Sequence, residues 1–163
     1  MRYADGPTAE VEVVVHAPLE RIWALVTDIG LPARFSSELR GAEWIDAGPA
    51  VGARFRGRNE HAAIGTWETT CVVTRCEPPR VFEWAVGSAD HASAAWRFEL
   101  EPDGETVRLR QWCRIGPAPS GLTPAILAMP GKEERIVARR LDEFRANMQA
   151  TLDGIKQLAE EAP

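Results

Sequence analysis

The sequence predicts an α+β fold in which a curved antiparallel sheet of seven strands packs around one long C-terminal helix. Between residues 42 and 114, short segments of alternating polar and apolar residues are separated by turns that contain Gly or Pro. This pattern is typical of antiparallel strands. From Lys132 onward the apolar residues instead recur at steps of three and four, which indicates an amphipathic helix. A sheet and a helix of this kind must bury their apolar faces against each other.

The composition indicates one globular domain and excludes two classes of protein. The 163 residues fit a single domain spanning positions 1–163, since domains usually contain about 100–150 residues. A hydrophobic fraction of 45% excludes intrinsic disorder. The net charge of -5 argues against a nucleic-acid partner, because proteins that bind nucleic acids need a basic surplus to neutralise phosphates.

Two segments bear on the location of the protein. Residues 1–8 lack the apolar stretch of a secretion signal. The longest uncharged stretch, residues 115–131, contains four prolines and three glycines, so it predicts a loop with a short helix and not a membrane span. We therefore expect a cytoplasmic protein without integral membrane association.

The beginning of the chain predicts one strand followed by two short helices. Residues 9–17 alternate valines with more polar residues, as in a half-buried first strand. Pro18 lies near the first turn of a short helix with one apolar face, and Asp28 and Gly30 end it. Residues 31–39 predict a second short helix or a turn.

Six further strands follow, and the Pro-Asp-Gly sequence at 102–104 is a strong signal for the last hairpin turn. The predicted strands are residues 42–46, 54–59, 66–76, 81–86, 94–101 and 106–114. In segment 54–59 the arginines point to one side, and Phe55, Gly57 and Asn59 point to the other. We expect the outward residues to form cross-strand ion pairs on a solvated face: Arg54, Arg56, Arg58, Arg97, Arg108 and Arg110 with Glu68, Glu83 and Glu99.

The C-terminal helix is predicted to contain 25–30 residues, or roughly 40 Å at 1.5 Å per residue. Its apolar stripe comprises Ile136, Val137, Leu141, Phe144, Met148, Leu152, Ile155 and Leu158. A helix of this length spans a whole small domain, so the curled sheet and the helix would enclose a space that is a natural ligand cavity.

The cysteine and histidine residues indicate neither a disulfide nor a metal or cofactor site. Cys71, Cys76 and Cys113 are an odd number of thiols in a chain without a secretion signal. Cys71 and Cys76 lie five positions apart in one predicted strand, so we expect them on opposite faces. The three histidines are far apart in the sequence, and no pair of them has metal-ligand spacing. Phosphate-loop and dinucleotide-binding motifs are missing from the sequence.

Three segments resemble the START-like (Bet v 1-like, SRPBCC) superfamily of the polyketide cyclase/dehydrase and lipid transport type. They are VHAPLERIWALVTD at residues 15–28, GTWETTCVVTRCEPPRVFEW at 65–84 and WRFELEPDGETVRL at 96–109. The resemblance covers nearly the whole chain and implies a helix-grip fold with a deep cavity. Members include aromatase/cyclases, lipid and hormone binders, co-chaperones and oxygenase domains, and some relatives sequester natural products. Because these motifs consist mostly of packing and turn residues, they specify the fold more than the function.

The alternation of the strands predicts which residues face the cavity. The expected ligand-binding residues are Arg34, Glu38, Phe55, Asn59, Trp67, Thr69, Trp84, Trp96, Phe98, Gln111, Phe144 and Met148. The aromatic residues of this set suit a flat apolar ligand, although each taken alone could simply fill a core. Asn59 and Gln111 are polar residues on apolar faces, and they would orient a ligand or bond to the backbone. Arg34 and Glu38 are candidates for the rim, with solvated surface charge as the alternative.

Our leading hypothesis is a protein that binds a small hydrophobic, aromatic or polyketide-like molecule, with a polyketide cyclase activity that needs no metal if it is an enzyme. Two alternatives are a non-catalytic carrier or self-resistance protein, and a co-chaperone-like interaction domain. Glu38 and His61 are the candidates for a general base. Since neither is convincing, the sequence favours binding over catalysis.

Overall fold

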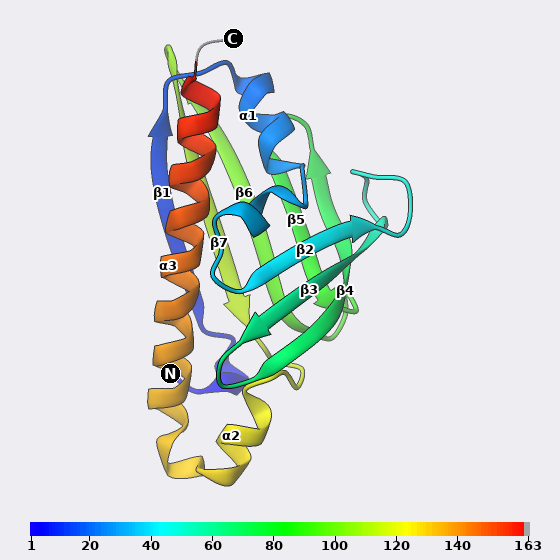
Figure 1. Ribbon diagram of the computed structural model, residues 1–163, viewed down its shortest axis with the longest axis vertical. Coiled ribbons are helices and arrows are strands. Elements are labelled where there is room, and N and C mark those ends of the chain that lie inside the picture. The colour runs from blue at the N-terminus through cyan, green and yellow to red at the C-terminus, as the bar shows by residue number, and fades with distance from the viewer. Residues whose placement is uncertain (162–163) are drawn as a thin grey trace.

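Seven antiparallel strands form one curved sheet, and helix α3 (Glu133–Glu160) runs along it (Figure 1). The computed structural model describes residues 1–161, so the last two positions of the predicted domain lie outside the described residues. The strands follow the order β1-β7-β6-β5-β4-β3-β2. Their bounds are β1 Thr8–Val15, β2 Leu39–Trp44, β3 Arg54–His61, β4 Gly65–Glu77, β5 Val81–Gly87, β6 Ala92–Asp103 and β7 Thr106–Ile115. The predicted architecture is confirmed, and the 28 residues of α3 fall within the expected length.

Short helices cover the two ends of the sheet. Helix α1 (Leu19–Val26) and the 3₁₀ helix η2 (Leu31–Arg34) connect β1 to β2, as predicted. Helix α2 (Thr123–Ala128) and the turn η3 (Pro130–Lys132) connect β7 to α3. A further 3₁₀ turn, η1 (Tyr3–Asp5), precedes β1. In Figure 1, α1 and α2 lie near opposite ends of α3.

The second strand begins earlier than its alternation suggests. It starts at Leu39, not at position 42, and the helical turn before it ends at Arg34. Between them, the Ser36 hydroxyl oxygen accepts hydrogen bonds from the backbone N–H groups of Glu38 and Leu39, both at 3.0 Å. Such a serine turn ends helical structure, because its side chain takes over the backbone donors.

The expectation that Cys71 and Cys76 lie on opposite faces of β4 is wrong. The pairing of β4 with β5 shifts by one residue between Val73 and Arg75. Cys71 pairs with Val86 before this bulge, and Cys76 pairs with Phe82 after it. An extra residue in one strand reverses the alternation beyond it, so both thiols lie on the face that bears the core. All three cysteines are free thiols.

The core consists of two clusters, one at each end of α3. Toward the C-terminal end, Leu152 and Ile155 pack with Ile22 of α1 and with Phe82 and Phe98 of the sheet. Toward the N-terminal end, a second cluster joins α3 to β1 and β7 through Ala9, Cys113, Ile115, Val137, Leu141 and Met148. No described helix is both long and apolar enough to cross a membrane.

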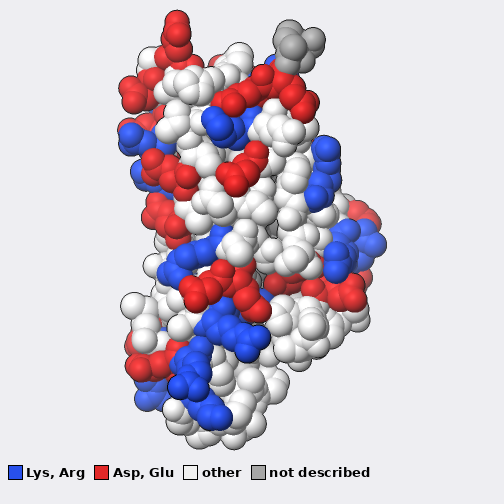
Figure 2. Space-filling view, turned by 60° about the vertical axis from the view of Figure 1, so that its left-hand side comes forward, with Lys and Arg blue, Asp and Glu red and all other residues white. Residues whose placement is uncertain are grey.

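The outer face of the sheet carries part of the predicted set of ion pairs, since Arg56 and Glu68 form none among the described residues and Arg54 and Arg58 pair with Asp46 and Glu43. Arg97 contacts Glu83 at 3.0 Å, and Arg110 contacts Glu10 at 2.8 Å. Acidic and basic side chains are also intermixed on the side of the molecule that bears α3 and β1, which Figure 2 brings forward. Exposed pairs of this kind contribute only about 0–1 kcal/mol each, but they place a carboxylate beside five of the six outward arginines.

Candidate ligand-binding cavity

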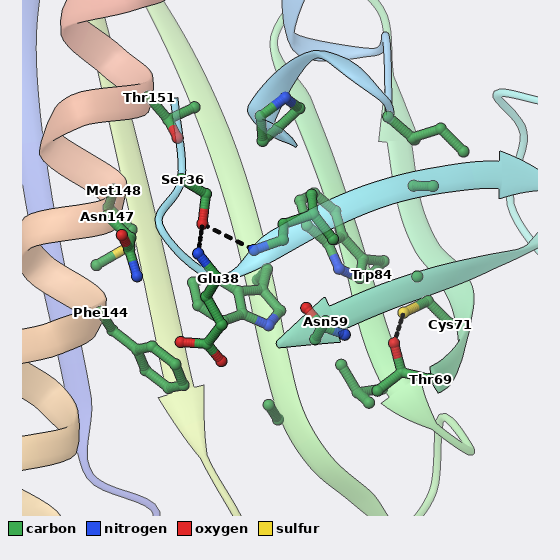
Figure 3. Close-up of a pocket in the computed structure, with 18 of the residues that line it drawn as sticks. Ser36, Glu38, Asn59, Thr69, Cys71, Trp84, Phe144, Asn147, Met148 and Thr151 are labelled. Carbon is green, nitrogen blue, oxygen red and sulfur yellow. Dashed lines mark hydrogen bonds between the residues drawn. The ribbon is translucent and has the colours of Figure 1, made fainter. Parts of the chain in front are cut away.

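A cavity of about 230 Å³ lies between the sheet and the middle of α3 (Figure 3). Strands β3 to β6 supply the largest group of its lining residues, and α3 contributes Arg140, Phe144, Asn147, Met148 and Thr151. Strands β2 and β7, helix α1, the turn between β3 and β4, and the segments before β2 and before α2 supply the remaining residues. The sheet curves away from α3 here, so the two apolar faces are not in contact along their whole length.

Every residue predicted from the sequence for the site lines this cavity except Arg34. The lining residues from that set are Glu38, Phe55, Asn59, Trp67, Thr69, Trp84, Trp96, Phe98, Gln111, Phe144 and Met148. Arg34 is exposed and lies over the ring of Phe35, with 5.5 Å between the guanidinium carbon and the ring centre. It therefore lies outside the site.

Aromatic rings from neighbouring strands form the apolar part of the wall. The Trp84 ring lies 5.4 Å from Phe82, 5.8 Å from Phe55 and 6.0 Å from Phe98, centre to centre. Across the cavity the Trp96 ring packs edge-on against Phe144 of α3 at 4.9 Å. These distances are typical of favourable aromatic pairs. The rings thus pack on one another and also line the cavity, so core packing and a ligand surface are compatible functions of the same residues.

Gln111 is the polar residue of the wall that packing does not explain. It is 5% exposed, and its side-chain oxygen Oε1 has no hydrogen-bond partner among the described residues. Its register places it between Phe98 of β6 and Val11 of β1, neither of which has a polar side chain. A buried amide oxygen without a partner is rare in native proteins, and this one lies at the wall of a cavity.

Near Asn59, the wall has polar but unreactive groups. Asn59 is half-buried at the end of β3, and the Thr69 hydroxyl lies 3.8 Å from the Cys71 sulfur. Burial raises the pKa of the Cys71 thiol to about 12, although the contact with Thr69 acts in the opposite direction. The thiol is therefore protonated at neutral pH and is a poor nucleophile.

A buried ion pair between Glu38 and Arg140 forms the charged part of the wall. Both terminal nitrogens of Arg140 donate to Glu38, Nη1 to Oε2 at 2.8 Å and Nη2 to Oε1. Nη1 also donates to Glu143 at 3.1 Å, and Glu143 lies 3.0 Å from Nε2 of His61. The Arg140 guanidinium lies 4.4 Å from the centre of the Phe144 ring. Figure 3 shows the Glu38 carboxylate beside that ring.

Backbone and side-chain hydrogen bonds hold Glu38 in this position. The Ser36 turn fixes its backbone N–H, and its carbonyl oxygen accepts a hydrogen bond from the N–H of Glu60 at 2.9 Å. The neighbouring Ser37 donates to the side-chain oxygen of Asn147 on α3 through both its N–H and its hydroxyl. The segment before β2 is therefore tied to both the sheet and the helix, and it carries the carboxylate inward.

Arg140 is the main residue of the site that the sequence analysis missed. It lies four positions before Phe144 and eight before Met148, so all three share one side of the helix. That spacing could have identified it, but a charged residue in an apolar stripe is easily assigned to solvent. Asp28, Asn147 and Thr151 also line the cavity and were not predicted.

The ionisation of this group of residues follows from its hydrogen bonds. Burial acts to raise the pKa of Glu143, but hydrogen bonds from His61 and Arg140 outweigh it and hold the pKa below its ordinary value. Burial likewise acts to lower the pKa of Arg140, and the bonds to Glu38 and Glu143 raise it instead. Glu143 is therefore a carboxylate and Arg140 a cation at neutral pH.

Neither candidate general base is placed to abstract a proton from a ligand. Both oxygens of Glu38 accept hydrogen bonds from Arg140, and His61 does not line the cavity. Asp28 lines it but is exposed, and its Oδ1 accepts a hydrogen bond from Gly30. Within residues 1–161, no three His, Cys, Asp or Glu side chains gather as metal ligands would. The arrangement can hold and orient a molecule.

Comparison with known proteins gives a family and a set of similar folds. The family model described as polyketide cyclase / dehydrase and lipid transport matches residues 7–160. The polyketide cyclase-like protein Cgl2372 from Corynebacterium glutamicum is 31% identical, with 94% of this chain and 91% of that one covered and a TM-score of 0.64. A search of curated proteins found no significant match.

More distant similarities concern the fold alone. The di-domain ARO/CYC protein BexL of the BE-7585A biosynthetic pathway is 14% identical, with a TM-score of 0.73. This chain is covered to 96% in that alignment but spans only 51% of BexL. Ara h 8.0201 is 12% identical with a TM-score of 0.55, with 90% of this chain and 98% of that one covered.

Proposed function

Because this chain belongs to the polyketide cyclase/dehydrase and lipid transport family, we propose that it binds a small, flat hydrophobic molecule, aromatic or polyketide-like, between its sheet and α3. The observation that carries the proposal is the unpartnered Oε1 of Gln111 in a mainly apolar wall that includes several aromatic rings. The rings would cover the faces of the ligand. The amide oxygen would accept a hydrogen bond from a ligand hydroxyl, which satisfies an atom that is otherwise buried without a partner.

The size of the cavity supports a compact ligand. Its volume of about 230 Å³ is below the usual ligand-pocket range of roughly 300–1,000 Å³. A molecule of two or three fused rings suits such a space better than a long extended chain. Burial of its apolar surface would supply about 25 cal/mol per Å² toward binding.

Cyclase activity is the second candidate function. The fold shared with the ARO/CYC proteins BexL and StfQ favours it. Cyclisation of a poly-β-keto chain requires a proton acceptor beside the reacting carbon, and the carboxylate that faces the cavity most closely, Glu38, is held by Arg140. We therefore place binding first, with a carrier or sequestering role as its simplest form.

The substitution Gln111→Leu tests the proposal with two probes, 2-naphthol and naphthalene. Leucine removes the amide oxygen and keeps a similar volume. We expect affinity for 2-naphthol to fall about tenfold, because one buried hydrogen bond is lost. Affinity for naphthalene should be unchanged. The free protein should become more stable by about 1–3 kcal/mol, since a buried polar atom without a partner is removed. Calorimetric titration and urea unfolding measure the two effects.

The matched control is Gln157→Leu, which makes the same change at an exposed position of α3 and should alter neither affinity. If the wild-type protein binds neither probe, the binding proposal is wrong. Equal losses for 2-naphthol and naphthalene in Gln111→Leu would show that the residue acts through packing alone. Conversion of a poly-β-keto substrate to a cyclised product would establish the second candidate, and binding without turnover would support the carrier.

A further inference from the structure

The charged residues of the cavity wall bear on which ligands it accepts. Among the described lining residues, three are charged: Asp28, Glu38 and Arg140. The wall therefore carries two carboxylates and one guanidinium. Asp28 is exposed, whereas Glu38 and Arg140 are only 8% and 6% exposed. The buried charges are thus one anion and one cation in direct contact.

The cation of this pair is already occupied. Each terminal nitrogen of Arg140 donates to an oxygen of Glu38, and Nη1 also donates to Glu143. The ring of Phe144 lies against the guanidinium. A carboxylate on an incoming ligand would have to compete with two carboxylates for one guanidinium. Paired bonds between guanidinium and carboxylate are among the strongest hydrogen bonds in proteins.

Displacement of Glu38 by such a ligand would also be unfavourable. The serine turn and the contacts with Asn147 hold the segment that carries Glu38, so the carboxylate cannot easily turn toward solvent. A buried carboxylate that loses its partner is strongly destabilising. An acid that entered without displacing Glu38 would instead place two like charges close together in a poorly solvated space.

We infer that the cavity selects uncharged ligands that carry a hydroxyl donor and rejects carboxylic acids, and that Glu38 determines this selectivity. The inference rests on the proposed function and names its ligand class. Gln111 supplies the complementary half of the argument, because its free group is an acceptor. A phenol satisfies that acceptor without bringing a charge, whereas an ionised acid brings a charge and no donor.

The substitution Glu38→Gln tests the inference with 2-naphthol and 2-naphthoate at neutral pH, where the first is uncharged and the second ionised. We expect the wild-type protein to bind 2-naphthol at least about tenfold more tightly than 2-naphthoate. In Glu38→Gln the guanidinium loses its closest carboxylate, so affinity for 2-naphthoate should rise about tenfold or more. The ratio of the 2-naphthoate dissociation constant to the 2-naphthol dissociation constant should therefore fall about tenfold or more. Calorimetric titration measures all four dissociation constants.

Glu43→Gln is the matched control. Glu43 lies on β2, five positions after Glu38, but it is exposed, with its carboxylate 3.1 Å from Arg58 and its side chain 70% exposed. The substitution changes the net charge by the same amount and should alter neither affinity. Circular dichroism and urea unfolding show whether each variant is folded. If Glu38→Gln does not fold, Glu143→Gln removes the other carboxylate from Arg140 and should raise 2-naphthoate affinity about threefold.

The outcomes separate the inference from the proposed function. If the wild-type protein binds 2-naphthoate as tightly as 2-naphthol, the inference is overturned and the binding function stands. An unchanged 2-naphthoate affinity in a folded Glu38→Gln variant would also overturn the inference. If Glu38→Gln does not fold, an unchanged 2-naphthoate affinity in Glu143→Gln would overturn it. If the wild-type protein binds neither probe, the proposed function itself fails.

Discussion

The cysteine side chains illustrate how burial controls chemistry at a single residue. Burial raises the pKa values of Cys71 and Cys113 to about 12. Cys76 also has a raised pKa because of burial, but it is only partly buried and lies 3.9 Å from a backbone oxygen of Pro49. The three thiols therefore differ mainly in how far each is exposed to solvent.

We predict that iodoacetamide at about pH 8 modifies Cys76 first in the folded protein. A thiol of pKa about 12 is ionised to roughly one part in 10⁴ at that pH, and Cys71 and Cys113 are also shielded from the reagent. Peptide mass mapping after timed quenching gives the rate at each site. In urea all three should react at similar rates. Modification of Cys71 as fast as Cys76 in the folded state would contradict the described cavity wall.

At the scale of elements, helix α3 must approach the segment after η2 closely. Gly154 is buried in the middle of the C-terminal half of α3. A Cβ atom at this position would lie 2.5 Å from two ring atoms of Phe35. The glycine therefore allows the ring to pack directly on the helix backbone. This contact holds the segment that leads to Glu38.

We predict that Gly154→Ala destabilises the protein by about 1–3 kcal/mol, the usual range for overpacking. In an exposed helix the same substitution would instead stabilise by about 1 kcal/mol, so the sign of the effect is diagnostic. Gly131→Ala serves as the control, because a Cβ atom there meets no atom within 4 Å. Urea unfolding followed by circular dichroism measures both. A stabilised Gly154→Ala would show that Phe35 does not pack on this glycine.

At the scale of the whole molecule, ion pairs link distant parts of the chain and make stability depend on pH. Five carboxyl groups have pKa values lowered chiefly by basic partners or backbone N–H donors: Asp46, Glu77, Glu133, Glu143 and Glu160. A lowered pKa in the folded state means that the group stabilises the fold at pH values above its unfolded pKa. This stabilisation is lost as the pH falls through the folded pKa.

We therefore predict that the urea midpoint is constant above about pH 5 and falls as the pH drops below about 4.5, the ordinary value for a glutamate. Asp46 and Glu77 have the most exposed side chains of the five, at 40% and 57%, and salt weakens exposed pairs, so the contributions of these two carboxyls should be the most sensitive to salt. Glu143→Gln should lose less stability than the wild type between about pH 5 and pH 3. An equal or steeper loss in that variant would mean that Glu143 does not contribute to acid unfolding.

Much of the cavity wall was predictable because strand alternation is a local property. Trp84, Trp96, Phe98 and Gln111 were assigned to the inner face from their spacing alone, and they line the cavity. The same rule fails at Cys76, where a bulge adds one residue to β4. No pattern in the sequence marks that bulge. The prediction that Arg34 lines the cavity is wrong for a different reason. A short 3₁₀ turn has no strong periodicity from which the direction of a charged side chain could be predicted.

By itself, the sequence determined the order of the elements, the inward side of the strands wherever their alternation is uninterrupted, and the length of the C-terminal helix. These properties depend on residues a few positions apart. Only the tertiary structure decided that Glu38 meets Arg140, a residue 102 positions away. That contact depends on the curvature of the sheet, the serine turn before β2 and the position of α3. The physical basis of the contact is burial, since a carboxylate and a guanidinium that are enclosed together must pair. In the sequence alone, either residue resembles an ordinary surface charge.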